Sequence, residues 1–424
     1  MPSSETQIIM NIRAVKGTRD ILPPASAVWN EIEETSRRVF RTFNVQEIRT
    51  PIFEETALFS RGVGEETDIV SKEMYSFDDH GTSLTLRPEN TASVIRAYIE
   101  HRMDQIPGVK KLFYIGPMFR RERPQKGRFR QFSQIGAEII GSDSPAVDAE
   151  VIELVDALLI ANGVKGARLL VNSVGDPESR ARYVARLKAD LEQHLPSLSP
   201  DSQRRAVTNP LRVLDSKDPQ DQSIVEKLPS IHEYLNDACR DHFAAVCRYL
   251  DDRGIAYEVT PRLVRGLDYY THTTFEFLHG ALGAQNAICG GGRYNGLAEL
   301  LGSKVPAPGI GFSIGEDRLV MAVEEARGGI TASKLPLFIA PMTEPAFRKG
   351  ALIARALRAQ NIGVECAAPA KLKRLMELAN KANASHTLLI GEDELAQGRF
   401  ALKNMETGAQ QTVDEAELAA IITR

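Results

Sequence analysis

The sequence has few cysteines and no long apolar run. Its four cysteines, Cys239, Cys247, Cys289 and Cys366, have neither metal-like nor disulfide-like spacing, so we expect reduced thiols in a cytoplasm and no catalytic cysteine. A membrane-spanning helix needs about eighteen or more consecutive apolar residues, and none of that length occurs. The first residues, MPSSETQIIMNIRAVKG, lack a basic start followed by an apolar core and so predict no secretory signal.

The chain also lacks a large charge of either sign. Its net charge of −4 argues against a surface covered in positive potential, so a nucleic-acid partner would have to bind local basic patches. The apolar fraction of 43% and the charged fraction of 25% are those of an ordinary globular protein. A length of 424 residues predicts about two or three domains.

An arginine-rich loop between two apolar strands is the most unusual segment, in FYIGPMFRRERPQKGRFRQFSQIGAEII from Phe113 to Ile140. Guanidinium groups bind phosphate and carboxylate oxygens two at a time, so the loop predicts a phosphate-binding site. A solvated basic hairpin is an equally good interpretation of the loop alone. The basic residues around the single acidic Glu122 are Arg120, Arg121, Arg123, Lys126, Arg128 and Arg130.

The first half of the chain predicts an antiparallel sheet interrupted by helices. An amphipathic helix from Ala25 to Phe43 leads to a strand ending at Pro51, and Ser144-Pro145 begins a helix to about Ala161. The segment from about 177 to 252 is helical, polar and punctuated by Asp and Pro, which indicates an inserted lobe. The predicted strands are Leu84–Leu86, Leu112–Phe119, Phe132–Ile140, Tyr257–Phe277, Ala287–Gly292 and Gly309–Ile314.

Beyond a Gly-rich and polar linker, EARGGITASKLP, the pattern changes. Strands LPLFIAPM, IGVECAA and HTLLIG alternate with helices over Glu344–Gln360 and Lys371–Ala384, and a hairpin follows over Phe400–Val413. Alternating strands and helices predict a small parallel-sheet α/β domain.

Five segments of high polar density lie at predicted strands or strand ends: LRPENTAS, the arginine loop, SQIGAE, LVRGLDYYTHTTFEF, and GGGRYNGLAELLG with PGIGFSIGEDR. Together with VKGTRDILPP near the N-terminus, they resemble the histidyl-tRNA synthetase family over essentially the whole chain. TPIFE with Pro51, FRRE (Phe119 to Glu122) and PGIGFSIGEDR ending in Arg318 resemble the three motifs of class II aminoacyl-tRNA synthetases. RGLDYYT, from Arg265 to Thr271, is specific to the histidine enzymes.

The resemblance implies an α+β catalytic domain, with the class II antiparallel sheet flanked by helices and a helical insertion, followed by a C-terminal α/β anticodon-binding domain. The expected boundaries are 1–325 for the catalytic domain with its insertion at about 177–252, 326–334 for the linker and 335–424 for the anticodon-binding domain. It also implies a cytoplasmic homodimer that activates L-histidine with ATP and transfers it to tRNA(His), without a membrane.

For ATP, the resemblance implies that Arg120 bridges the α-phosphate and the histidine carboxylate, and that Arg318 holds the γ-phosphate. Arg265 would reach the α-phosphate from the other side, where related enzymes place a metal ion, so Arg120 and Arg265 are the expected catalytic residues. Phe132 would stack on adenine, although a core aromatic is the alternative. The expected ATP-binding residues are Arg120, Glu122, Arg128, Phe132 and Arg318, with Mg²⁺ carried in by ATP and no metal held by the protein itself.

Histidine recognition needs two partners, because the roles of the imidazole nitrogens change with protonation. By the resemblance, Glu138 accepts from one nitrogen and Tyr270 serves the other. A buried carboxylate without a partner costs free energy, so a Glu after the apolar QIGA favours a ligand; a Glu pointing outward is the alternative. The expected histidine-binding residues are Glu89, Thr91, Arg120, Gln134, Glu138, Arg265, Tyr269, Tyr270 and Tyr294, of which Glu89, Thr91 and Gln134 would hold the α-amino group.

The chain departs from the family pattern at Asn90, where Gly is common, and at Glu316, where many relatives have an apolar residue. One alternative is the non-catalytic, synthetase-like regulatory subunit of ATP phosphoribosyltransferase, but such proteins usually lack the C-terminal domain and the intact RGLDYYT segment. Another class II synthetase fits poorly with Glu138 and Arg265. The residues that could contact tRNA phosphates, or equally form solvated helix faces, are Arg348, Arg355, Lys371, Lys373 and Arg374.

Overall fold

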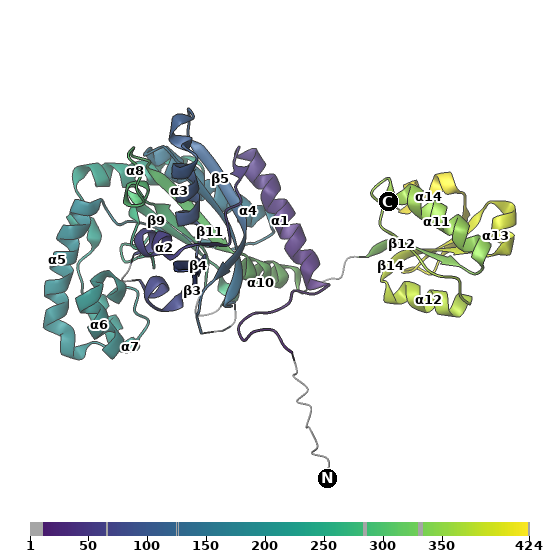
Figure 1. The fold of residues 1–424 in the computed structure, drawn as a ribbon, viewed down its shortest axis with the longest axis horizontal. Helices are drawn as coiled ribbons and strands as arrows, with labels where there is room; N and C mark the ends of the chain where they lie inside the picture. Colours follow the sequence, from purple (N-terminus) through teal and green to yellow (C-terminus); the bar gives the residue numbers. More distant parts are fainter. Residues whose placement is uncertain are drawn as a thin grey trace, which may run out of the picture. The chain divides into compact units, whose positions relative to one another are not determined.

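The computed structural model describes residues 12–64, 67–123, 125, 127–282, 286–329 and 334–422. These residues form two compact units, one of residues 12–21 and 28–329 and the other of residues 22–27 and 334–422 (Figure 1). Lys126 of the arginine loop, residues 330–333 of the expected linker and the outermost residues of both expected domains lie outside the described residues.

The larger unit is built on an eight-stranded sheet in the order β1-β5-β6-β11-β10-β9-β7-β8. Neighbouring strands are antiparallel except at the two edges, where β1 and β8 each pair in parallel with the adjacent strand over two residues. The predicted antiparallel sheet is confirmed, with short parallel additions at its edges. The strands are β1 (Gln46–Glu47), β5 (Lys110–Phe119), β6 (Gln131–Ile140), β7 (Arg168–Ser173), β8 (Glu258–Val259), β9 (Thr271–Leu278), β10 (Ala287–Arg293) and β11 (Gly309–Gly315).

Two predicted strands are wrong in extent. The strand expected to end at Pro51 contributes only Gln46–Glu47 to the main sheet, because Pro51 lacks the N–H that a sheet ladder needs and the chain turns there into another sheet. The strand expected over Tyr257–Phe277 is two strands separated by a loop, which Pro261 and Gly266 interrupt and which carries Arg265.

A separate three-stranded sheet has the order β2-β4-β3, with β2 (Phe53–Glu55), β3 (Tyr75–Asp79) and β4 (Thr82–Leu86). Helix α2 (Thr56–Val63) follows β2, and α3 (Thr91–Glu100) follows β4. A π-helical segment, Ile69–Glu73, leads into β3.

Alternation along β6 separates the core from the candidate site. Ile135, Ala137 and Ile139 join the main hydrophobic core, so the intervening Gln134 and Glu138 face the opposite side of the sheet. Four helices bury apolar residues in that core: α1 (Ala25–Thr42), α4 (Pro145–Ala161), α8 (Asp237–Asp252) and α10 (Glu316–Arg327). A second cluster on the side of Glu138 includes residues of α3 and of the short helix α9 (Leu297–Leu300). The main core and the candidate site therefore share one strand.

Three helices of the segment after β7 begin with a capping residue followed by proline. Asp176, Ser199 and Asp218 accept backbone N–H groups at the starts of α5 (Pro177–His194), α6 (Pro200–Thr208) and α7 (Pro219–Val225). These helices bury a hydrophobic cluster of their own, which includes Tyr183. Helix α8, the last of the predicted 177–252 segment, contributes to both cores, because Cys239 packs in the lobe while Val246 and Leu250 pack against the main sheet.

The smaller unit has a five-stranded sheet in the order β13-β12-β14-β15-β16. Its first three strands are parallel, and β15 and β16 form an antiparallel hairpin, as predicted. The strands are β12 (Leu335–Pro341), β13 (Val364–Cys366), β14 (Ala384–Ile390), β15 (Phe400–Asn404) and β16 (Gln410–Val413), and the helices are α11 (Glu344–Arg358), α12 (Leu372–Lys381), α13 (Glu392–Gln397) and α14 (Glu415–Ile422). None of the helices in the described parts of the chain has the length and apolarity of a membrane span.

Candidate functional site

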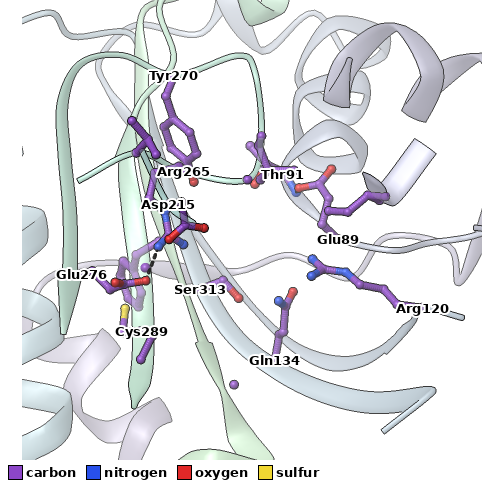
Figure 2. A pocket seen from close by; sticks show the side chains of 18 of the residues that line it. Glu89, Thr91, Arg120, Gln134, Asp215, Arg265, Tyr270, Glu276, Cys289 and Ser313 are labelled. Atoms are coloured by element: carbon purple, nitrogen blue, oxygen red, sulfur yellow. Dashed lines mark hydrogen bonds and ion pairs between the residues drawn. The ribbon is translucent and has the colours of Figure 1, made fainter. Parts of the chain in front are cut away.

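A cavity of about 790 Å³ opens on the side of the main sheet that carries Glu138. Every residue that the sequence predicted for histidine or ATP lines it: Glu89, Thr91, Arg120, Glu122, Arg128, Phe132, Gln134, Glu138, Arg265, Tyr269, Tyr270, Tyr294 and Arg318. Figure 2 shows Glu89 and Arg120 facing Arg265 across the cavity, with Gln134 and Ser313 on the sheet between them. Segments far apart in the sequence therefore meet in one space.

Glu138 is held by three hydroxyl groups. Its Oε1 accepts from Thr91 at 2.8 Å and from Tyr114 at 3.3 Å, and its Oε2 accepts from Tyr294 at 2.6 Å. Burial raises the pKa of Glu138 to about 8, although the hydrogen bonds from Tyr294 and Thr91 lower it. Glu138 is buried, so the alternative of an outward-pointing side chain is wrong, but three protein hydroxyl groups already donate to it and its burial alone does not require a ligand.

Glu89 caps the start of α3. Its two oxygens accept the backbone N–H groups of Thr91 at 2.7 Å and Ala92 at 2.9 Å, which have no partner within the helix. Burial raises the pKa of this carboxyl, and the N–H of Ala92 opposes the rise. The cap orients Thr91 so that its hydroxyl reaches Glu138. Glu89 and Glu138 thus belong to one hydrogen-bonded unit.

Three tyrosines form an aromatic wall beside these carboxylates. The ring of Tyr269 lies 4.8 Å from that of Tyr270 and 5.8 Å from that of Tyr294, the latter edge to face. Burial raises the pKa of each of the three phenols, so they are neutral at pH 7 and can donate hydrogen bonds. Gln134 lies on the adjoining sheet, where its Oε1 is buried and accepts no hydrogen bond from the described residues.

The arginine side of the cavity begins at the end of β5. The Nε of Arg120 donates to the carbonyl oxygen of Pro88 at 2.9 Å, and its guanidinium lies 5.3 Å from the centre of the Phe132 ring. Glu122 lies between two cations, 3.0 Å from Arg128 and 3.8 Å from Arg120. The carbonyl of Pro88 and the carboxylate of Glu122 thus hold Arg120 at the edge of the cavity.

Arg318 approaches from the first turn of α10. It donates to the carbonyl oxygens of Gly127 at 3.4 Å and Ala287 at 2.5 Å, and forms no ion pair within the described residues. Burial lowers its pKa, and the charge of Arg128 lowers it further. Two guanidinium groups that repel each other in this way favour an anion between them.

Arg265 lies in the loop between β8 and β9 and forms an ion pair with Glu276 of β9 at 2.5 Å. Burial lowers the pKa of Arg265, but the charge and hydrogen bond of Glu276 together with nearby Tyr270 and Cys289 outweigh this and raise the pKa overall. The side chain of Arg265 remains 22% exposed, and its Nε is buried and bonded to none of the described residues. Its guanidinium is therefore anchored on one side and open to the cavity on the other.

The glycine run of β10 makes room for protein groups. A Cβ at Gly290 would collide with the guanidinium of Arg265, and one at Gly292 would lie 2.8 Å from the ring of Tyr270. The absence of side chains at these glycines therefore leaves room for Arg265 and Tyr270.

Sequence reasoning missed two residues of the site. Tyr114 in FYIGPMF donates to Glu138, and Glu276 in TTFEF anchors Arg265. Glu276 could have been noticed as the one acidic residue of strand β9, between two phenylalanines, whereas Tyr114 gave no such signal. The rim also includes Arg205, Arg212, Lys217 and Arg262, together with Asp68 and Asp215. Within the described residues no group of three or more His, Cys, Asp and Glu side chains is arranged to hold a metal ion.

The chain matches two family models, one described as Histidyl-tRNA synthetase over residues 17–319 and one described as Anticodon binding domain over residues 337–424. It is 65% identical over 410 residues to a protein of Solibacter usitatus named Histidine–tRNA ligase, covering 96% of this chain and 98% of the relative. A relative of the same name from Koribacter versatilis is 54% identical over 425 residues, 97% of this chain and 96% of its own.

Among solved structures, apo S. aureus histidyl-tRNA synthetase aligns with a TM-score of 0.80 at 38% identity, over 97% of this chain and 100% of that one. A protein of Bacillus halodurans C, described as an ATP phosphoribosyltransferase regulatory subunit/histidyl-tRNA synthetase, aligns with a TM-score of 0.64 at 22% identity, over 87% of this chain and 96% of its own. At that identity the likeness concerns the fold alone.

Proposed function

The chain belongs to the histidyl-tRNA synthetase family, and we propose that it is a histidine–tRNA ligase that activates L-histidine with ATP and transfers it to the 3′ end of tRNA(His). The observation that carries the proposal is the meeting of anion-binding arginines and imidazole-binding polar groups in one cavity. In the first step the histidine carboxylate attacks the α-phosphorus of ATP, giving histidyl-adenylate and pyrophosphate. In the second, the terminal ribose hydroxyl of the tRNA takes the histidyl group and AMP leaves.

Arg120 and Arg265 are the proposed catalytic residues. The histidine carboxylate and the α-phosphate repel each other, so a guanidinium on each side of the meeting point lowers the cost of approach. Arg120 is held by Pro88 and Arg265 by Glu276, and this anchoring keeps reorganisation small as charge builds on phosphorus. Neither residue needs to form a covalent bond with the substrate, since positioning and charge stabilisation suffice for this class of reaction.

ATP would bind along Arg120, Glu122, Arg128, Phe132 and Arg318. Arg318, whose hydrogen bonds go to neutral carbonyl groups, would hold the γ-phosphate, while adenine stacks on Phe132. Mg²⁺ enters with the nucleotide and prefers phosphate and carboxylate oxygens. Glu122 is one carboxylate on this side of the cavity that could share it, but Glu122 already pairs with Arg128, and Glu73 also lines this side.

Histidine would bind along Glu89, Thr91, Arg120, Gln134, Glu138, Arg265, Tyr269, Tyr270 and Tyr294. Glu138 would accept from one imidazole nitrogen while retaining hydroxyl donors, because each carboxylate oxygen can accept more than one hydrogen bond. Tyr270 would donate to or accept from the other nitrogen. The open Oε1 of Gln134 supports a role in holding the α-amino group, together with Glu89 and Thr91.

The domain assignment is part of the same proposal. We assign residues 1–325 to catalysis with the insertion at about 177–252, 326–334 to the linker and 335–424 to anticodon binding. Exposed cations of the C-terminal domain, such as Arg348, Lys373 and Arg374, support contacts with tRNA phosphates. All four cysteines are free, which supports a reducing cytoplasm as the location.

We also infer a homodimer, with a second copy covering the three-stranded sheet beside Pro51. Phe53 and Phe77 lie on one face of this sheet, in register with Leu86 and Leu84, and are 54% and 47% exposed. Large exposed aromatic side chains on a sheet face are typical of an interaction surface. A molar mass of twice the chain's mass in solution would support the dimer, and a monomer at micromolar concentration would contradict it.

Exchange of labelled pyrophosphate into ATP, measured with each amino acid in turn, tests the function. Exchange stimulated by histidine alone is the expected result. Histidine binding without any exchange would favour the regulatory subunit, which the full-length relatives do not favour. Exchange with another amino acid would indicate a different synthetase.

A further inference from the structure

Arg19, in the VKGTRDILPP segment, has none of the binding roles proposed above. It nevertheless contacts residues next to the proposed ATP-binding residues. Its guanidinium donates to the Oδ1 of Asp317 at 2.8 Å. It also lies 4.1 Å from the centre of the Phe129 ring, and more loosely, at 5.9 Å, over Trp29 of α1. The side chain of Arg19 is 44% exposed while that of Asp317 is 6% exposed, so a surface cation pairs with a buried anion.

Asp317 uses its other oxygen on β6. Its Oδ2 accepts the backbone N–H of Ser133 at 3.2 Å, at a point between Phe132 and Gln134. The next residue along α10 is Arg318. Asp317 therefore links the strand that carries the proposed adenine platform to the helix that carries the proposed γ-phosphate ligand, and Arg19 neutralises the carboxylate that makes this link.

The same N-terminal segment also holds the return side of the arginine loop. The backbone N–H of Arg130 donates to the carbonyl oxygen of Gly17 at 2.7 Å, and the Arg130 side chain donates to that of Lys16 at 3.2 Å. Phe129, on which Arg19 stacks, lines the cavity. Four contacts from residues 16–19 thus converge on residues 129 and 130 and on the start of α10.

We propose that Arg19 is a positioning residue for ATP, acting through Asp317 and Phe129 to set the arginine loop, β6 and Arg318 in the geometry that binds the triphosphate. The inference rests on the proposed function for the identity of the nucleotide. It adds to that function a residue for which no contact with either substrate is proposed. Glu138 and the three tyrosines of the histidine side make none of these contacts, and Gln134 only adjoins one of them at Ser133, so the effect should fall mainly on ATP.

The test compares Arg19→Ala with Arg327→Ala in the full chain. Arg327 also joins α10 to another element through an ion pair, with Glu31 of α1, but both partners are exposed and lie at the far end of the helix. We expect Arg19→Ala to raise the KM for ATP in pyrophosphate exchange by about tenfold, with the KM for histidine changed by less than about twofold. Arg327→Ala should leave both values unchanged.

Arg19→Lys and Asp317→Asn refine the test. Lysine can keep the charge beside Asp317 but cannot stack as a planar group on Phe129, so partial rescue is expected. Combining Arg19→Ala with Asp317→Asn should raise the KM for ATP little more than Arg19→Ala alone, because Arg19→Ala already removes the contact with Asp317. Equal rises in the two KM values, or additive effects in the double variant, would overturn the inference.

Calorimetric titration of each folded variant with ATP alone separates this inference from the proposed function. If the wild-type chain binds ATP but shows no histidine-dependent exchange, the function fails while the role of Arg19 is still measured. If Arg19→Ala proves unfolded, Arg19→Lys carries the test in the same titration. Wild-type affinity for ATP in Arg19→Lys and in Asp317→Asn would then reject the inference.

Discussion

Around Glu138, both oxygens of each buried carboxylate, Glu89 and Glu138, accept hydrogen bonds from the protein. Around Arg120, by contrast, two guanidinium groups share Glu122, and Arg318 donates only to neutral carbonyl groups. The buried carboxyl groups of the histidine side are thus satisfied before any ligand binds, and the buried Oε1 of Gln134 is left without a donor among the described residues. The nucleotide side holds positive charge that the described protein groups only partly neutralise. This difference suits the proposed ligands, since one is a small polar group that must be discriminated and the other is a polyanion that must be held.

Arg265→Ala should give the largest effect, because it removes a cation from the boundary between the two sides. We expect adenylate formation to fall by about a thousandfold while histidine binding is largely retained. Single-turnover formation of histidyl-adenylate and equilibrium titration with histidine measure the two quantities. Arg262→Ala is the matched control, since Arg262 lies in the same loop but bonds to carbonyl groups of the lobe. A near-normal rate in Arg265→Ala would remove this residue from the mechanism.

Glu138→Gln should affect histidine binding more than ATP binding, and its effect should be smaller than that of Arg265→Ala. Glutamine keeps the size of the side chain but cannot become negatively charged, and its NH2 group cannot accept a hydrogen bond from an imidazole N–H. We expect histidine affinity to fall by about tenfold to a hundredfold and ATP affinity to change little, as measured by calorimetry. Tyr114→Phe, which removes only the longest of the three hydrogen bonds, should have a weaker effect. Equal losses for both ligands in Glu138→Gln would count against its assigned role.

The smallest expected effect concerns stability and Glu316. This residue is a buried carboxyl that lacks the hydroxyl donors found around Glu138. Neither of its oxygens accepts a hydrogen bond within the described residues. Burial raises its pKa to about 8, although Ser133 and the charge of Arg37 oppose this rise. A carboxyl whose pKa is higher in the folded than in the unfolded chain binds more protons when folded. Its contribution to stability is therefore present below pH ~4.5 and is lost as the pH rises to about 8.

Glu316→Leu should remove this dependence. At pH 8 we expect the free energy of unfolding of the variant to exceed that of the wild type by about 2 kcal/mol, so the variant should unfold at a higher temperature. At pH 5 we expect little difference. Thermal unfolding followed by circular dichroism at both pH values measures it, and histidine-dependent exchange should be nearly unchanged. An equal shift at both pH values would indicate a packing effect and would contradict titration of Glu316.

Local chemistry in the sequence was enough to locate many elements. The Asp-Pro and Ser-Pro pairs at residues 176–177, 199–200 and 218–219 cap helices where the pattern predicted helices, because a capping side chain and a fixed proline act within one turn. Alternation along β6 likewise separated core residues from cavity residues. The strand expected to end at Pro51 failed because the same local rules do not say which of two sheets a short apolar segment joins.

The sequence by itself determined most of the groups that enter the cavity, since the motifs at strand ends and the arginine loop contain them, although Tyr114 and Glu276 were identified only in the structure. Only the tertiary structure decided how those groups are satisfied. The donors to Glu138 lie 24, 47 and 156 residues away, and Arg19 lies 298 residues from Asp317. Hydrogen bonds over such separations depend on how strands pair and helices pack, and no local pattern encodes that pairing.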